Sequence, residues 1–335
     1  RNWSCYQTGK RSETGMKELQ EKVKQLLDNN EVEMVIGWGK GSLPLISTPI
    51  FIKNPADADQ LIFDSTCRNN LTTYLTKDRR RLGKKYDKIG IIVKGCDARS
   101  IVLYVIENQV KRENVVIIGV PCQGIFEARK IINITDGREV LEQKTEGDQV
   151  ILKGRDFEIK VPREQVLRDC CLFCRYPDAP EYDHFIGEHR GEIDVQDEFK
   201  IVEDFEKKSA EERWNLITEE YSKCIRCYAC RNVCPSCYCN YCFVDNNDPQ
   251  WIGKTPEVTD NIIFHLIRNL HLAGRCVDCG ACVSACPVNL DLRPLNKKVE
   301  KEMKERFGYT AGLDINEKPA MASYCENEKQ DFILG

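Results

Sequence analysis

Two cysteine runs constrain this chain more than any other feature. Each has the spacing C-x-x-C-x-x-C-x-x-x-C and is followed at once by a proline. The first run consists of Cys224, Cys227, Cys230 and Cys234, and the second of Cys276, Cys279, Cys282 and Cys286. Three thiolates at two-residue intervals can wrap a loop around three corners of an iron–sulfur cube, whereas the fourth, before proline, serves the other cluster.

This spacing predicts two 4Fe–4S clusters with crossed ligands. We expect the first to be bound by Cys224, Cys227, Cys230 and Cys286, and the second by Cys276, Cys279, Cys282 and Cys234. Zinc is the alternative, but it prefers paired C-x-x-C knuckles and takes only four ligands. The long interval between the runs, with an amphipathic helical pattern over 261–272, resembles the helical ferredoxin modules of succinate dehydrogenase and heterodisulfide reductase subunits.

The overall cysteine content supports metal binding. The chain has 19 Cys among 335 residues, so complete disulfide pairing is excluded, and tight clustering suits metal sites in a reducing compartment. The net charge of −4 excludes a generally basic nucleic-acid binder. Apolar runs stay far below the ~18 residues of a membrane span, and no secretory signal is evident. We therefore expect a cytoplasmic protein without a transmembrane segment or a nucleic-acid partner.

The first half of the chain alternates short apolar runs with helical stretches. Strands are predicted at 34–36, 61–63, 89–93 and 115–120, and the last three are each followed by a helical pattern, which indicates parallel βα units. Gly154-Arg155-Asp156 predicts a hairpin turn. The expected fold is an α/β N-terminal domain with a mainly parallel sheet, plus a C-terminal ferredoxin-type domain. The expected boundaries are an α/β domain over 1–175, an acidic linker over 176–211, a two-cluster domain over 212–310 and an extended tail over 311–335.

Cysteines also follow three of the predicted strands. Cys67, Cys96 and Cys122 each stand between a strand and a helix, and the carboxyl ends of parallel strands share one ligand-binding edge. A helix N-terminus there favours a thiolate. A third cluster is predicted on Cys96, Cys122, Cys171 and Cys174, with Cys67 and Cys170 as substitutes. The alternative is that these are ordinary buried cysteines, which are common.

Two weaker patterns give further candidate sites. Cys237, Cys239 and Cys242 follow the first run, and they would bind a fourth cluster with Cys67, form a local zinc site, or remain unliganded. Gly37, Gly39 and Gly41 follow a predicted strand and would form a flavin phosphate loop. The glycine segment fits neither the Rossmann nor the Walker pattern, so a plain turn is favoured. No catalytic side-chain arrangement is evident.

The chain resembles the beta-subunit family of deazaflavin-reducing hydrogenases and formate dehydrogenases. The resemblance rests on Gly119-Val120-Pro121-Cys122-Gln123, on Cys171-x-x-Cys174 with the acidic run that follows, and on the ferredoxin pair. It implies an α/β domain with an iron–sulfur module, and FAD in the members that reduce the deazaflavin coenzyme. The family includes subunits of heterodisulfide-reductase-linked complexes of anaerobes. Here the ferredoxin module is C-terminal, and the Cys237–Cys242 group is extra.

These patterns support two functional hypotheses. The favoured one is an iron–sulfur electron-transfer subunit of an anaerobic multi-subunit oxidoreductase, docked to other redox subunits. The alternative is an FAD-containing subunit that transfers hydride to or from a deazaflavin or nicotinamide coenzyme. A non-redox structural or regulatory module is disfavoured by the repeated cluster motif.

Overall fold

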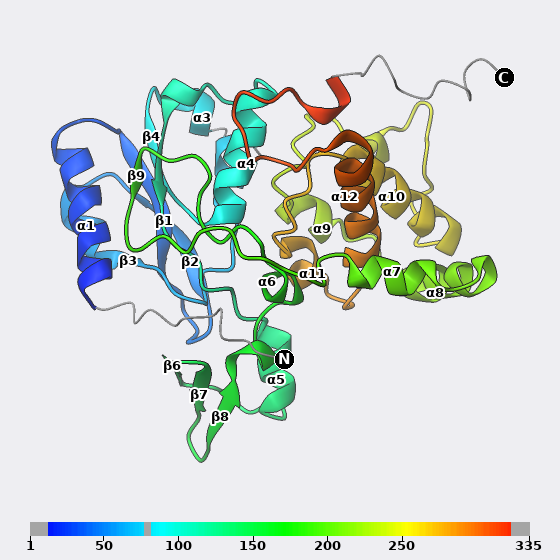
Figure 1. Cartoon of the computed structure of the whole chain (residues 1–335), viewed down its shortest axis with the longest axis horizontal. Coiled ribbons are helices and arrows are strands. Elements are labelled where there is room, and N and C mark those ends of the chain that lie inside the picture. The colour runs from blue at the N-terminus through cyan, green and yellow to red at the C-terminus, as the bar shows by residue number, and fades with distance from the viewer. Residues whose placement is uncertain (1–12, 77–81, 323–335) are drawn as a thin grey trace.

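The computed structural model describes residues 13–76 and 82–322, with an α/β part and a helical C-terminal part side by side (Figure 1). The first part is built on a six-stranded sheet of order β2-β1-β4-β5-β9, with β3 also paired to β1. Four strands run parallel: β1 (Met34–Lys40), β4 (Ile89–Val93), β5 (Val115–Gly119) and β9 (His184–Phe185). Strands β2 (Ser47–Ile52) and β3 (Leu61–Ile62) are antiparallel to β1. The mainly parallel sheet is as expected.

The central strands form because they are almost entirely apolar. Every residue of β4 and β5 is buried, as expected for parallel strands covered on both faces. Helix α1 (Glu13–Asp28) and helix α4 (Gly95–Ile106) lie on opposite sides of the sheet in Figure 1. Both contribute to one core, α1 with Leu19 and Val23 and α4 with Ile101 and Tyr104. The remaining helices of this part are short: α2 (Thr73–Thr76), α3 (Leu82–Lys85), α5 (Ala128–Ile134) and α6 (Asp169–Leu172).

The glycine segment of the first strand differs from expectation. Strand β1 does not end at Gly37 but continues to Lys40, and Gly37 and Gly39 pair with Ile50 and Thr48 of β2. A Cβ on Gly37 would collide with the side chain of Leu61. These two glycines therefore allow close packing inside the sheet. Only Gly41 lies in the connection to β2, where its N–H donates to the Ile46 carbonyl.

The predicted hairpin is part of a small antiparallel sheet. Its strands are β6 (Glu142–Glu146), β7 (Gln149–Lys153) and β8 (Glu158–Pro162). The pairing of β7 with β8 confirms the hairpin, whereas β6 was not expected because four of its five residues are exposed and none is a large aliphatic residue. This sheet lies below the main sheet in Figure 1, away from the cysteine-rich part.

The C-terminal part is helical. It contains α8 (Ala210–Ser222), α9 (Ala229–Val233), α10 (Val258–His271), α11 (Ala281–Ala285) and α12 (Arg293–Phe307). Helix α10 covers most of the amphipathic stretch predicted over 261–272. Helices α9 and α11 lie inside the two cysteine runs and pack against each other. Around them, Tyr221, Phe264, Leu290 and three of the cysteines form one core.

The segment predicted as a linker is integrated into the fold. Its strand β9 pairs with β5, and its helix α7 (Lys200–Glu206) packs on α12. The segment 308–322, where an extended tail was expected, returns across α4 (Figure 1), and Arg99 Nε donates to the Ala311 carbonyl at 2.9 Å. The rest of the predicted tail lies outside the described residues. Among the described helices, none is long and apolar enough to cross a membrane.

Candidate iron–sulfur centres

The first crossed ligand set lies together in the helical part. The thiol of Cys224 lies within electrostatic range of Cys286 and Cys227, and that of Cys230 within range of Cys224 and Cys286. Burial raises the pKa of Cys230 to about 12. Cys227 is exposed, whereas the other three thiols are buried. One side of this set therefore faces the protein surface.

The second crossed set lines a single cavity. Cys234, Cys276, Cys279 and Cys282 all contribute to its wall. Cys279 and Cys282 each interact electrostatically with Cys234, and Cys276 interacts with Cys282. Cys234 has thus crossed from the first run to the second set, which is the arrangement that the spacing predicts.

The loops of both runs have the same unusual backbone. Arg226 and Tyr228 in the first run, and Asp278 and Gly280 at the equivalent positions of the second, have positive φ values between 46° and 69°. These left-handed residues curl the chain around its own thiols. The Arg226 N–H consequently donates to Cys224 Sγ at 3.4 Å, and such N–H donors stabilise thiolate charge.

Arg268 of α10 is buried between the two sets. Its Nη2 donates to the Cys230 carbonyl at 3.3 Å, and its charge interacts with the thiols of Cys234 and Cys282. Among the described residues it has no carboxylate partner, and its Nε and Nη1 have no hydrogen-bond partner. A buried guanidinium without an anion is costly. The surroundings of Arg268 therefore fit an anionic group such as a thiolate-bound cluster.

His265, one turn before Arg268, contacts a ligand candidate directly. Its Nε2 lies 3.4 Å from Cys224 Sγ, and its ring stacks on Tyr221. Burial and the nearby Arg268 charge lower the pKa of His265 to about 3, so the ring is neutral. A neutral imidazole has one N–H, which can donate to the sulfur.

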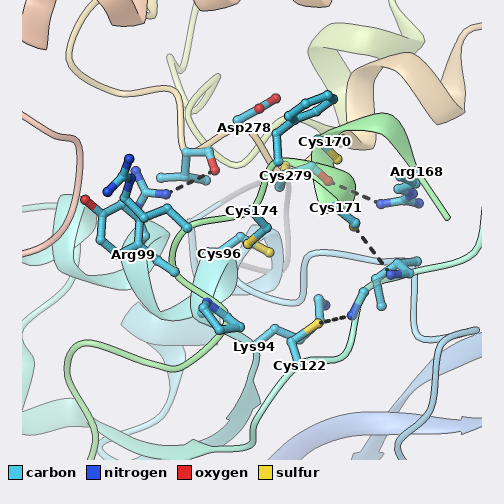
Figure 2. A pocket seen from close by; sticks show the side chains of 18 of the residues that line it. Lys94, Cys96, Arg99, Cys122, Arg168, Cys170, Cys171, Cys174, Asp278 and Cys279 are labelled. Atoms are coloured by element: carbon cyan, nitrogen blue, oxygen red, sulfur yellow. Dashed lines mark hydrogen bonds between the residues drawn. The ribbon is translucent and has the colours of Figure 1, made fainter. Parts of the chain in front are cut away.

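The third predicted ligand set also lines one cavity, at the carboxyl edge of the sheet (Figure 2). Cys96 lies at the start of α4 after β4, and Cys122 follows β5, so the βα topology brings them together. Cys171 and Cys174 come from α6 and the turn after it. Cys122 interacts electrostatically with Cys96 and Cys171, and Cys174 with Cys122 and Cys171.

The protonation of these thiols follows from their surroundings. Burial raises the pKa of Cys122 and raises that of Cys174 to about 12. A hydrogen bond from Cys170 instead lowers the pKa of Cys171. Bound iron would replace the thiol protons, because a coordinating thiol is deprotonated outright. The four donors are thus chemically suited to a cluster, which takes four thiolates.

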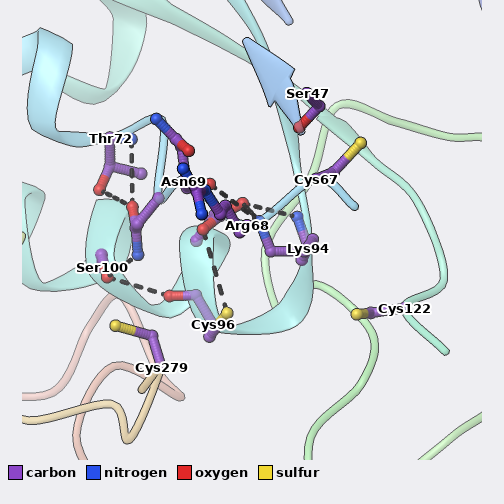
Figure 3. Close-up of polar contacts among 12 residues, drawn as sticks. Ser47, Cys67, Arg68, Asn69, Thr72, Lys94, Cys96, Ser100, Cys122 and Cys279 are labelled. Atoms are coloured by element: carbon purple, nitrogen blue, oxygen red, sulfur yellow. Dashed lines mark hydrogen bonds and ion pairs between the residues drawn. The ribbon is translucent and has the colours of Figure 1, made fainter. Parts of the chain in front are cut away.

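Buried cations surround the third set, and the sequence did not indicate them. Lys94 Nζ donates to Asp97 at 2.8 Å. It also donates to the Asn69 carbonyl at 3.1 Å, as Figure 3 shows. Arg168 donates to the Arg68 and Cys279 carbonyls, both at 3.3 Å. The Lys94-Gly-Cys-Asp97 strand–helix junction was visible in the sequence, but the burial of its charges depends on the tertiary packing.

The second and third sets meet at one residue. Cys279 lines both cavities, and its thiol interacts electrostatically with Cys96. Gly280, next to Cys279, packs against Cys170. A Cβ at this position would collide with Cys170 Sγ, so only glycine allows the two segments to lie this close. The first and second sets are linked in the same way through Cys230 and Cys282. The three sets therefore follow one another in space.

The fourth expected set is only partly brought together. Cys237, Cys239 and Cys242 line one cavity, but Cys67 is not part of its wall. Cys67 lies in the core of the sheet, accepts a hydrogen bond from the Asp64 N–H at 3.4 Å, and has its pKa raised to about 12 by burial. It also follows β3, which is antiparallel to β1, so it does not end a parallel strand as Cys96 and Cys122 do.

No three donors are arranged for a single metal ion within the described ranges 13–76 and 82–322, counting His, Cys, Asp and Glu side chains. The four thiolates of an iron–sulfur cube bind four different irons, so they stand further apart than the ligands of one ion.

Comparison with known proteins agrees with this geometry. A family model described as a 4Fe-4S dicluster domain matches residues 216–287. The chain is 24% identical to the F420-dependent formate dehydrogenase subunit beta of Methanocaldococcus jannaschii, over 87% of this chain and 90% of that protein. It is 26% identical to the F420-dependent formate dehydrogenase 1 subunit beta of Methanococcus maripaludis, over 91% and 92%. The resemblance to the beta-subunit family is confirmed.

Together, the relatives and the domain match support the expectation of an iron–sulfur electron-transfer subunit of an oxidoreductase complex. Among solved structures, the chain matches the F420-reducing [NiFe] hydrogenase complex from Methanosarcina barkeri. That match has 15% identity and a TM-score of 0.38, and it covers 50% of this chain and 64% of the other.

Proposed function

We propose that this chain is the internal electron relay of a complex whose catalytic subunit is of the formate dehydrogenase type and which exchanges electrons with a deazaflavin coenzyme. The names of the two relatives suggest these reactants. The main support for the relay is that the three thiol sets follow one another in space. Cys96 of the third set is close to Cys279 of the second, and Cys230 of the first set is close to Cys282 of the second.

The proposed ligands are those that the spacing predicts. Cys224, Cys227, Cys230 and Cys286 form the first set, Cys276, Cys279, Cys282 and Cys234 the second, and Cys96, Cys122, Cys171 and Cys174 the third. Bound 4Fe–4S clusters would supply one-electron transfer. All of these cysteines except Cys227 are buried or half-buried. The chain directs backbone N–H groups at Cys122, Cys171 and Cys224, and its Arg268 offsets the negative charge of the thiolates.

We favour the relay over a flavoenzyme. The segment considered for flavin phosphate binding holds Gly37 and Gly39 inside β1, where their backbone groups pair with β2. Those N–H groups are thus engaged in the sheet, so they offer no phosphate loop. The exposed thiol of Cys227, next to the exposed Ile225, suggests where a partner redox subunit exchanges electrons with the first set.

The test is the cofactor content of the chain purified without oxygen together with its partner subunits. Each 4Fe–4S cluster brings four irons, so the relay predicts at least about twelve irons in this chain and no flavin bound to it. About eight irons would eliminate the third set. One FAD released from this chain on denaturation would overturn the pure relay in favour of the flavoenzyme.

A further inference from the structure

Three thiols that the two-cluster pattern does not use line a cavity beside the second set. They are Cys237, Cys239 and Cys242, in the loop after α9. The other groups of this cavity wall include Arg268, His271 and Arg275. The cavity adjoins that of the second set, because Ser236, Arg268 and Leu272 line both.

We propose that this cavity binds a fourth iron–sulfur cluster, held by Cys237, Cys239, Cys242 and, in place of the expected Cys67, His271. The proposal rests on the proposed function, since it adds a branch to the same relay. The three thiols have C-x-C-x-x-C spacing and lie on one loop, whereas Cys67 lies in the sheet core.

His271 lines the same cavity as the three thiols, and its imidazole is the fourth donor of the proposed set. His271 ends α10, and Arg268 lies three residues earlier, so both project from one face of the helix. The His271 ring packs edge-on against Phe243, with 5.5 Å between ring centroids. Imidazole is a suitable iron ligand, and it replaces thiolate in some natural iron–sulfur centres.

The charges around the cavity fit an anionic occupant. A cube of charge +2 with three thiolates and a neutral imidazole has a net charge of −1. Arg275 pairs with Glu107 at 2.7 Å, and Arg231 pairs with Asp245 at 3.0 Å. Arg268 has no such carboxylate within the described residues, and it holds two buried nitrogens without a hydrogen-bond partner close to Cys237. Because Arg268 lines the cavity of the second set as well, its charge adjoins both the second cluster and an anion in this cavity.

A cluster fits the donor arrangement better than a single zinc ion. No three of these donors are close enough for one ion in the described part of the chain. The same is true of the eight ferredoxin-type thiols, which belong to a matched 4Fe-4S dicluster domain. The C-x-C-x-x-C spacing and the shared cavity wall are the observations that favour a cluster.

This fourth centre would create a branch in the relay. One electron leaves the reduced second cluster, which is oxidised by one electron, and the fourth cluster is reduced by that electron without proton transfer. Cys237 follows Cys234 by three residues, and the Cys237 N–H donates to the Cys234 carbonyl at 3.2 Å. Cys239 is exposed, like Cys227 of the first set. The second cluster would therefore pass electrons toward two exposed thiols, toward Cys227 through the first cluster and toward Cys239 through the fourth.

The decisive experiment compares iron content and EPR spectra of the wild-type chain, isolated in its complex, with two variants. In the triple variant C237S/C239S/C242S, we expect this chain to lose about four irons and one EPR signal, with the remaining signals unchanged. The Cys67→Ser control should retain all its iron. A triple variant that keeps its iron, a Cys67→Ser variant that loses four irons, or a loss of one zinc ion would overturn the proposal.

A further variant tests the fourth ligand. His271→Cys should keep the iron count and lower the midpoint potential of one signal only, because thiolate adds negative charge where imidazole had none. An unchanged potential for every signal would overturn the role of His271. The total iron content separates the fourth cluster from the third. If the triple variant loses about four irons and keeps about eight, only the two ferredoxin-type clusters remain, which would contradict the third set and support the fourth.

Discussion

At the scale of single residues, buried cations and hydrogen-bond donors lie around the cysteine sulfurs and can offset the negative charge of thiolates. Arg268, Lys94 and Arg168 are at least 95% buried, although desolvation of a charged group costs several kcal/mol unless anions compensate it. Lys94 is paired with the buried Asp97, and the positions of Arg268 and Arg168 next to thiol sets explain why those two are tolerated. The sequence could not indicate them, because nothing in the local pattern distinguishes these cations from the many others in the chain, which range from buried to exposed.

Replacing Arg268 should affect more than one centre at once. In Arg268→Met, the midpoint potentials of the clusters on the first and second sets should both fall, because a positive charge no longer favours the reduced state. A charge interaction of about 1–2 kcal/mol at an effective dielectric constant near ~20 corresponds to tens of millivolts, at about 59 mV per tenfold change. Arg268→Lys should restore most of the loss. EPR-monitored redox titration measures this, and a shift in neither potential would contradict the assignment.

Replacing His265 should affect one centre only. His265→Ala removes the only side-chain nitrogen within hydrogen-bond reach of Cys224 Sγ in the described structure. The potential of the first cluster should fall by no more than about 40 mV, the equivalent of a hydrogen bond of about 1 kcal/mol. The same titration with His189→Ala, whose exposed ring stacks on Phe185, should give wild-type values. A fall confined to the second cluster would show that Cys224 is not a ligand of the first cluster.

At the scale of elements, the sequence was most informative where one physical rule decides the structure. The apolar runs of β4 and β5 predicted buried parallel strands, and the C-x-x-C spacing predicted loops that wrap their own thiols. The predicted end of β1 was wrong. Gly37 and Gly39 suggest a turn in the sequence, and only the structure shows that Leu61 packs against the strand at Gly37. Helix α8 begins with a Ser209–Glu212 capping box that sequence reading could have found. Strand β9 has only two residues and gives no periodic signal.

The loop of the second run depends on Gly280. Gly280→Ala should cost more stability than Gly147→Ala, since both glycines have positive φ, but only a Cβ on Gly280 meets a neighbour, Cys170 Sγ. Overpacking typically costs about 1–3 kcal/mol. Anaerobic thermal unfolding of both variants measures the difference. Equal melting temperatures would mean that the Cys170 segment does not pack on the cluster loop.

At the scale of the whole molecule, the α/β part and the helical part are joined beside the second thiol set. Tyr104 of α4 donates to the Pro235 carbonyl at 2.7 Å, beside the second set, and Arg275 pairs with Glu107. The segment 308–322 covers α4 from the other part. The domain boundaries expected from the sequence missed this, because the acidic composition of 176–211 resembles a linker although β9 belongs to the sheet.

The Tyr104 hydroxyl should matter for the junction and not for cluster binding. Tyr104→Phe leaves the buried Pro235 carbonyl without this donor, so the free energy of unfolding should fall by about 1–2 kcal/mol. Tyr182→Phe, which removes an exposed hydroxyl near His189, is the matched control and should have little effect. Chemical denaturation and iron content together test this. Loss of iron in Tyr104→Phe would mean that the junction itself is needed to hold a cluster.

The central claim is that the thiol sets form one continuous relay through Cys279. The most direct measurement is the EPR spectrum of the fully reduced complex, in which neighbouring paramagnetic clusters broaden and split each other's lines. The account predicts that Cys279→Ser removes the second cluster's signal and leaves the first and third clusters with narrower, uncoupled lines. If the spectra of those two clusters were identical in the wild-type protein and the variant, the second cluster would not lie between them and the relay would be contradicted.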